Sequence, residues 1–162
     1  ESFGPGFVSI CSAIQKLATK FPDVMFVYPV HLNPNVQDPV KRILGNLQNV
    51  KLIKPQDYEH FIFLMINSKL ILTDSGGVQE EAPSLGKPVV LMRDETERPE
   101  VLEAGMMEIV GTSSKKIFNS VSKLLTDKRK YEQMSKVIDI YGNGTAAQSI
   151  LKVIKRDEFT YE

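Results

Sequence analysis

The chain has 162 residues, of which 42% are hydrophobic and 25% charged, which fits one globular domain with an ordinary core. Its 20 basic and 20 acidic residues cancel, and no apolar run approaches the roughly 20 residues that span a bilayer, so we expect neither a nucleic-acid partner nor a membrane one. The single cysteine, Cys11, excludes an intramolecular disulfide and a cysteine-rich zinc site and favours a reducing, cytoplasmic setting.

Five short apolar runs are predicted to form strands. In chain order they are residues 24–30 (VMFVYPV), 50–53 (VKLI), 70–73 (LILT), 89–92 (VVLM) and 108–110 (EIV). Most of these runs are continuously apolar rather than alternating, which is typical of strands that a parallel sheet buries on both faces.

Segments with helical periodicity alternate with these strands. They cover residues 7–20, 34–47, 58–66, 76–85, 99–104, 115–125, 129–138 and 145–155. The first places on one face Phe7, Ile10, Cys11, Ile14 and Leu17. The second starts at Pro34, with Asn33 as its expected N-cap. This alternation predicts a single Rossmann-like α/β domain: a doubly wound parallel sheet with helices on both faces.

Ligands of such a sheet bind beyond the carboxyl ends of its strands. Four loops are expected there: residues 29–34, 54–58, 74–77 and 93–100. These loops are therefore where we expect the functional side chains.

The loop at residues 74–77 is the most informative of the four. A buried strand runs into Ser75, Gly76 and Gly77, and a helix with Val78 and Ala82 on its apolar stripe follows. Two glycines without Cβ atoms let backbone N–H groups approach a ligand, and the helix start supplies unpaired donors and partial positive charge. The turn therefore suits a phosphate group. The residues alone leave open a second interpretation, in which Asp74 or Ser75 caps the helix and the glycines only make the turn.

Two other features support an anion site but have ordinary explanations as well. Glu80 and Glu81 lie one turn into the helix, where a carboxylate can reach ribose hydroxyls or simply face solvent. Arg93 and Arg98 lie in the charged loop that follows the next strand. Their guanidinium groups suit a diphosphate, although a surface salt-bridge cluster explains such a loop equally well.

The loop at residues 54–61 (KPQDYEHF) offers groups that could hold a base. Phe61 or Tyr58 could stack on it and Gln56 could read its edge, whereas aromatic side chains at helical spacing more often belong to a core.

Residues 72–100, LTDSGGVQEEAPSLGKPVVLMRDETERPE, closely resemble the signature of non-hydrolysing UDP-N-acetylglucosamine 2-epimerases. Further landmarks agree along the chain: FGPGF, YPVHLNPNV, KPQDYEHF and YGNGTAAQSI. The resemblance covers essentially all 162 residues.

The resemblance implies a protein of two Rossmann-like domains in a GT-B arrangement, with this chain as the C-terminal, UDP-binding domain over residues 1–162. The implied reaction interconverts UDP-N-acetylglucosamine and UDP-N-acetylmannosamine by elimination and re-addition of UDP, without metal or cofactor. It implies further a bacterial protein of cell-envelope polysaccharide synthesis, cytoplasmic and a homodimer at full length.

Individual residues take roles from the resemblance. Gln56 and Phe61 resemble the uracil contacts. Ser75, Gly76 and Gly77 resemble the diphosphate cradle.

Three further residues match family positions. Glu81 resembles the carboxylate that binds ribose, and Arg98 a motif arginine near the phosphates. His31 resembles a histidine that contacts a second, regulatory UDP-sugar.

No catalytic residue is expected within the chain. In the family the acid and base carboxylates lie in the N-terminal domain, and a further histidine lies just upstream of the segment ESFGPGF. The isolated chain is therefore expected not to epimerise. Two alternatives stay open: the donor-binding domain of a GT-B glycosyltransferase and a non-catalytic sensor of UDP-sugars.

Overall fold

The structure, a computed structural model, describes residues 4–137, 140–142 and 144–156. Its strands are β1 (Phe26–Pro29), β2 (Val50–Ile53), β3 (Ile71–Thr73), β4 (Val89–Leu91) and β5 (Met107–Ile109). Its helices are α1 (Pro5–Lys20), α2 (Pro34–Leu44), α3 (Tyr58–Asn67), α4 (Gly76–Ser84), α5 (Pro99–Glu103), α6 (Ser114–Thr126), α7 (Lys128–Met134) and α8 (Ala146–Arg156). Strands and helices alternate through β5, as the sequence predicts.

All the paired strands are parallel. β1 pairs with β2, with Phe26 opposite Val50, and β4 lies between β3 and β5, with Val89 opposite both Ile71 and Met107. Hydrogen bonding divides the strands into a two-stranded and a three-stranded sheet, where a single sheet was expected. Each strand is only three or four residues long, which leaves little length for further ladder bonds.

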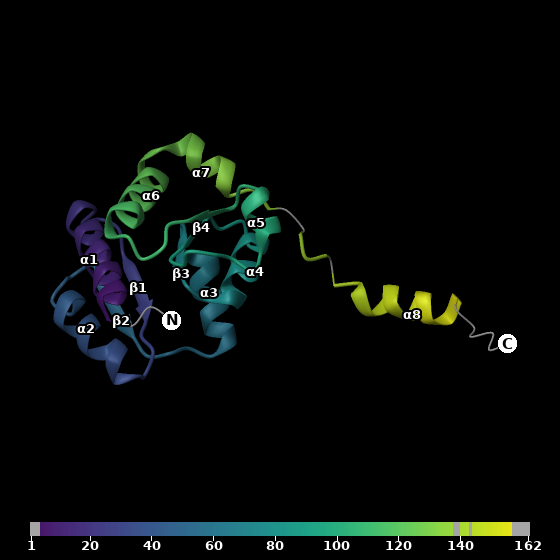
Figure 1. Cartoon of the computed structure of the whole chain (residues 1–162), viewed down its shortest axis with the longest axis horizontal. Coiled ribbons are helices and arrows are strands. Elements are labelled where there is room, and N and C mark those ends of the chain that lie inside the picture. Colours follow the sequence, from purple (N-terminus) through teal and green to yellow (C-terminus); the bar gives the residue numbers. More distant parts are fainter. Residues whose placement is uncertain (1–3, 138–139, 143, 157–162) are drawn as a thin grey trace.

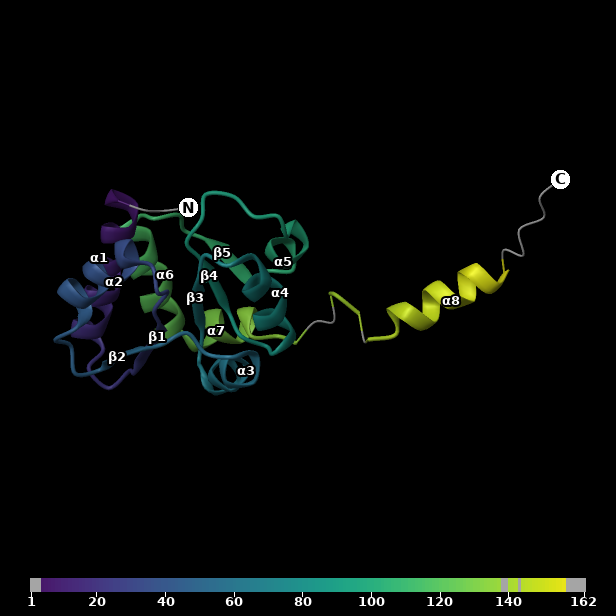
Figure 2. The same cartoon turned by 90° about the horizontal axis from the view of Figure 1, so that it is seen from below.

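Strand β4 shows why helices cover both faces. Val90 belongs to the core cluster formed with α1, α2, α6 and α7, whereas its neighbours Val89 and Leu91 belong to the cluster formed with α3, α4 and α5. Successive strand side chains point to opposite faces, so a fully apolar strand needs a layer of helices on each side. Figures 1 and 2 show these two layers, with α1 and α6 on one side of β4 and α3 and α4 on the other. The predicted doubly wound fold is confirmed.

Side-chain caps set the starts of several helices. Asn33 accepts a bond from the Asn35 amide at the start of α2, as predicted, and Ser113 and Asp127 cap α6 and α7 in the same way. Such caps satisfy amides that the first helical turn leaves without partners. The starts of these helices were therefore predictable to within one residue.

The last helix lies apart from the rest of the chain. In both views α8 extends away from the two helical layers (Figures 1 and 2). The helix expected near residues 129–138 ends at Met134, and Ile138 itself lies outside the described residues. Within the described part of the chain, no helix is both long enough and apolar enough to cross a bilayer.

Candidate functional site

The turn between β3 and α4 leaves the first amides of the helix open. Ser75 stands at the N-cap position, but its side chain makes no capping bond, and its own amide donates to Thr73 Oγ1 at 3.1 Å. The capping interpretation of Ser75 therefore does not apply here. The donors of the first turn are available to an anion, which a helix N-terminus favours electrostatically.

Gly76 and Gly77 are not required by the fold of the described residues. Neither has a positive φ, and a Cβ atom built on either one meets no described atom within 4 Å. Glycine in a helix costs stability relative to alanine. The space above this turn is open to a ligand, and we attribute the two glycines to that space.

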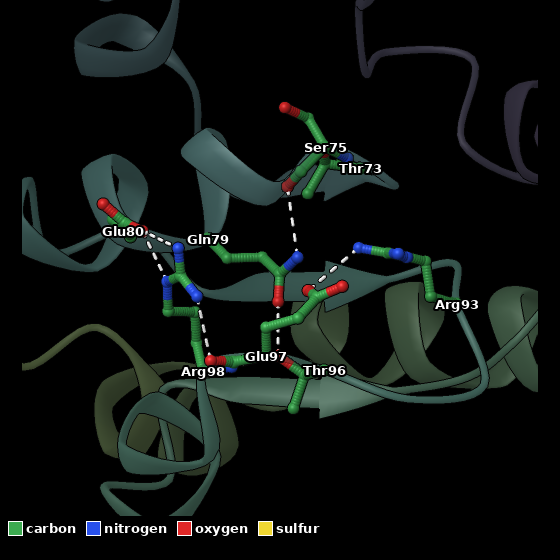
Figure 3. A network of polar contacts seen from close by, with 8 residues as sticks. All are labelled: Thr73, Ser75, Gln79, Glu80, Arg93, Thr96, Glu97 and Arg98. Atoms are coloured by element: carbon green, nitrogen blue, oxygen red, sulfur yellow. Dashed lines mark hydrogen bonds and ion pairs between the residues drawn. The ribbon is translucent and has the colours of Figure 1, made fainter. Parts of the chain in front are cut away.

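Buried behind the turn lies Gln79, which has no exposed surface. Its Nε2 donates to Ser75 O at 3.2 Å, and its Oε1 accepts from Thr96 Oγ1 at 2.5 Å. Figure 3 shows this amide joining the turn to the loop that follows β4. Gln79 was not among the residues that the sequence predicted for the site. The available signal was its place beside Val78 on the buried side of the helix.

The charged loop after β4 contacts α4, as expected for a loop that follows a strand neighbouring β3. Arg98 pairs with Glu80 on α4, and its Nη1 donates to Glu97 O at 2.9 Å (Figure 3). The hydrogen bond that Arg98 donates to Glu80 raises the pKa of Arg98, so this guanidinium stays fully charged. Arg93 donates to Glu97 at 3.0 Å. Part of the loop therefore forms the surface salt-bridge cluster that the sequence offered as an alternative to a ligand site.

The two glutamates on α4 have different neighbours. Glu80 holds Arg98, whereas Glu81 lies near Tyr58 at the start of α3, and its charge raises the pKa of that phenol. The loop expected to hold a base therefore lies beside the carboxylate expected to hold a ribose. The structure brings these two predicted groups together.

Gln56 and Phe61 occupy less specific positions. Gln56 is exposed and donates to Lys54 O at 2.7 Å within its own loop. Phe61 is partly buried and packs against the core cluster of α3, α4 and α5. It therefore contributes to the core, which the sequence offered as the alternative to stacking on a base. Their assignment to uracil remains a prediction.

His31 lies exposed in the loop between β1 and α2. Its Nδ1 accepts a bond from the Asn33 amide at 3.1 Å, which orients the ring beside the N-cap of α2. Its assignment to a regulatory UDP-sugar remains a prediction.

Among the described residues, no group of three or more His, Cys, Asp or Glu side chains could hold a metal ion. A hollow of about 350 Å³ beside the charged loop is lined by Met92, Arg93, Asp94, Glu95, Thr96, Glu97 and Thr112. Its lining carries Arg93 and three acidic side chains, so the hollow itself does not favour an anion.

Fold and site together define a class: a Rossmann-like α/β domain with an open, glycine-rich helix start and an arginine-bearing loop beside it. Comparison with known proteins is more specific. The family model for UDP-N-acetylglucosamine 2-epimerase matches residues 1–155. The chain belongs to this family, which confirms the resemblance found in the sequence.

Individual relatives agree with the family model. The chain is 56% identical to the UDP-N-acetylglucosamine 2-epimerase of Yersinia pestis and 53% identical to that of Escherichia coli K12, over 160 residues in each case. These matches cover 99% of this chain but 43% of each relative. The chain thus spans less than half the length of these relatives.

Solved structures show the same fold. The Neisseria meningitidis UDP-GlcNAc 2-epimerase bound to UDP-GlcNAc superposes with a TM-score of 0.91 at 45% identity, over 96% of this chain and 42% of that one. The S. aureus MnaA–UDP co-structure gives a TM-score of 0.89 at 41% identity, over 94% and 42%. Both comparisons confirm the predicted fold class.

Proposed function

We propose that residues 1–162 form one UDP-binding domain of an enzyme that interconverts UDP-N-acetylglucosamine and UDP-N-acetylmannosamine by eliminating and re-adding UDP. Family membership supports the reaction, and the ligands named for the Neisseria and S. aureus structures support the nucleotide. We propose also that the whole enzyme is a cytoplasmic homodimer of cell-envelope polysaccharide synthesis. We propose further that the protein does not bind nucleic acid, because its basic and acidic residues are equal in number.

The proposed site follows the nucleotide from phosphate to base. The open amides of Gly76 and Gly77 and the hydroxyl of Ser75 bind the diphosphate, with Arg98 beside them. Glu81 binds the ribose, one turn further along α4. Fixed donors at the diphosphate stabilise the charge that develops on UDP when its bond to the sugar breaks.

Two contacts complete the proposed site, and one position lies outside it. Gln56 and Phe61 border the uracil. His31 is assigned to a second, regulatory UDP-sugar. Neither His31 nor His60 is assigned to catalysis, so the chain contributes binding and electrostatics while acid–base groups come from the rest of the enzyme.

One observation carries this proposal: α4 begins with two glycines whose Cβ positions are open and whose conformation does not require glycine. Glycine costs helix stability at these positions, and it lets a ligand approach the backbone amides closely.

Binding of UDP to the chain tests the site. Two or three charge-assisted hydrogen bonds, less the cost of association, correspond to a Kd of about 0.1–1 mM. NMR titration or calorimetry should detect this affinity. Gly76→Val should abolish it by filling the space, and Arg98→Ala by removing the cation. If both variants bind UDP as the parent does, the site is wrongly assigned.

A chimera tests the reaction. This chain would replace the matching 160 residues of the Y. pestis relative, and NMR would follow UDP-N-acetylglucosamine without any acceptor. We expect conversion to UDP-N-acetylmannosamine by the chimera and none by the chain alone. Transfer of sugar to an acceptor would favour a glycosyltransferase, and binding without conversion would favour a sensor.

A further inference from the structure

Among the described residues, one large polar side chain is buried beside the proposed site, and its presence there needs a physical reason. Gln79 has no exposed surface and lies on the side of α4 that carries Val78 and Ala82 into the core. A buried amide is costly unless its hydrogen bonds are made, and an apolar side chain of similar length would fill the same space without that cost. A contribution to core packing does not therefore account for a glutamine here.

The amide is bonded at both ends. It donates to Ser75 O, at the turn that begins α4, and accepts from the Thr96 hydroxyl in the loop after β4. Thr96 Oγ1 in turn accepts from the Arg98 amide at 3.0 Å. Three hydrogen bonds in sequence thus join the glycine turn to the backbone of the arginine (Figure 3).

We infer that Gln79 and Thr96 are positioning residues, which fix the 93–98 loop against the start of α4 so that the backbone amides of the turn and Arg98 act on one diphosphate. This inference rests on the function proposed above. Neither side chain needs to touch the nucleotide. Both act through groups that do, by holding the two halves of the anion site in register before the ligand arrives.

Pre-organisation of this kind has a physical reason. Arg98 carries a long, rotatable side chain on a loop, and ordering both on binding would reduce affinity. A loop already tethered at Thr96, two residues before Arg98, loses less freedom when the ligand binds. The tether should therefore affect the diphosphate and leave the base and ribose contacts unchanged.

Three substitutions test the inference. Thr96→Val keeps the shape of the side chain and removes its hydroxyl, and Thr96→Ser keeps the hydroxyl. Thr126→Val is the matched control, since Thr126 Oγ1 makes a 2.8 Å bond to Ser122 O within α6, outside the site. NMR titrations with UDP and with uridine would measure affinity, and thermal unfolding would measure stability.

We expect Thr96→Val to weaken UDP binding about tenfold, as for the loss of one or two hydrogen bonds. Uridine, which lacks the diphosphate, should bind Thr96→Val and the parent alike. Thr96→Ser should restore UDP affinity to within about twofold of the parent. The control should bind both ligands as the parent does.

Other outcomes overturn the inference. Equal UDP affinity of Thr96→Val and parent, equal weakening for UDP and uridine, or failure of Thr96→Ser to restore binding would each refute a positioning role. If Thr96→Val does not fold, Gln79→Met breaks the same contact from the helix with a side chain suited to burial. Unfolding of both would mean that the contact maintains the fold rather than the site. A parent that binds no UDP would instead refute the proposed function, and this inference with it.

Discussion

At the scale of single residues, position along α4 separates groups of the same chemical type. Glu80 and Glu81 are adjacent, but one faces the loop after β4 and the other faces the start of α3. Neighbours on a helix point about 100° apart, so each can serve a different part of a bound nucleotide. The arginine is held on one side of the helix and the carboxylate assigned to ribose on the other.

Replacing Gly76 by alanine should separate stability from binding. Because its φ is not positive and its Cβ space is open, we expect Gly76→Ala to leave the free energy of unfolding unchanged or to raise it by up to about 1 kcal/mol. The added methyl occupies the space assigned to phosphate, so UDP binding should weaken. Thermal unfolding and NMR titration of the same variant measure the two effects.

The matched control is a glycine that the fold does require. Gly86 has a φ of +66°, and a Cβ atom there would lie 2.9 Å from Val137 Cγ2 and 3.1 Å from Ser135 O. Gly86→Ala should therefore destabilise the chain by about 1 kcal/mol or more. A Gly76→Ala variant that loses as much stability as Gly86→Ala would contradict the assignment of open ligand space.

The start of α3 should make stability depend on pH. The His60 amide and then its ring, with Nδ1 at 2.6 Å from the carboxylate, lower the pKa of Asp57. A lowered folded pKa stabilises the fold above the unfolded value of about 3.9, and this stabilisation disappears as the pH falls through the folded value. Asp57→Asn keeps an acceptor for the cap but loses the charge.

We therefore expect parent and Asp57→Asn to differ in unfolding free energy at neutral pH and to converge below about pH 4. Urea denaturation from pH 7 to pH 2 measures this difference. Asp23→Asn, in the exposed turn after α1, is the control. A difference that persists unchanged to pH 2 would show that charge is not its cause.

The sequence predicted which loops meet at the candidate site but not how their side chains pair. The glycine turn and the loop with Arg98 follow buried strands, and parallel strands bring such loops to one edge, so their meeting was predictable. Two contacts could not be predicted, because they depend on the geometry of the loop and hydrophobic periodicity does not encode it. They join Arg98 to Glu80 and Thr96 to Gln79. The burial of Gln79 could have been predicted in part, since this residue shares a buried side of α4 with Val78.

At the scale of elements, the positions of strands and helices followed from hydrophobic periodicity and capping. The expected strand at residues 24–30 was too long, because the observed β1 is limited to Phe26–Pro29, where it pairs with β2. An apolar run does not show where ladder bonds end, and in this one Met25 and Val27 are exposed rather than buried. Division of the strands into two sheets could not be predicted for the same reason.

A single amide holds the connection from α1 to β1. Asn49 Nδ2 lies 3.0 Å from Ala18 O, 3.1 Å from Phe21 O and 3.0 Å from Val24 O, all in the segment that turns from the helix into the strand. We expect Asn49→Ala to destabilise the chain by about 2 kcal/mol or more, because partly buried carbonyl groups lose their donor.

Chemical denaturation would measure this loss. Asn67→Ala is the control, since the Asn67 amide makes one exposed bond, to Phe63 O within its own helix, and should cost no more than about 0.5 kcal/mol. Equal effects of the two substitutions would show that the connection does not depend on Asn49.

At the scale of the whole molecule, the two helical layers form a packed body and α8 does not belong to it. Its apolar side chains are more than half exposed, namely Ile150, Leu151, Val153 and Ile154. An isolated helix of 11 residues is marginal in water. A helix with an apolar stripe needs a surface to cover that stripe. The match covers 43% of the Y. pestis relative, so most of that relative's length remains to supply such a surface.

Hydrogen exchange of α8 should therefore differ between the chain and the chimera described above. In the chain alone, we expect its amides to exchange almost as fast as unfolded ones, and deletion of residues 145–162 to leave the unfolding midpoint of the body within about 2 °C. In the chimera, we expect protection of the same amides, since the apolar stripe then has a surface to pack on. Ile150→Asp should abolish that protection without changing the exchange of α4 or α6. Equal exchange of α8 in both proteins would mean that the rest of the enzyme does not cover this helix.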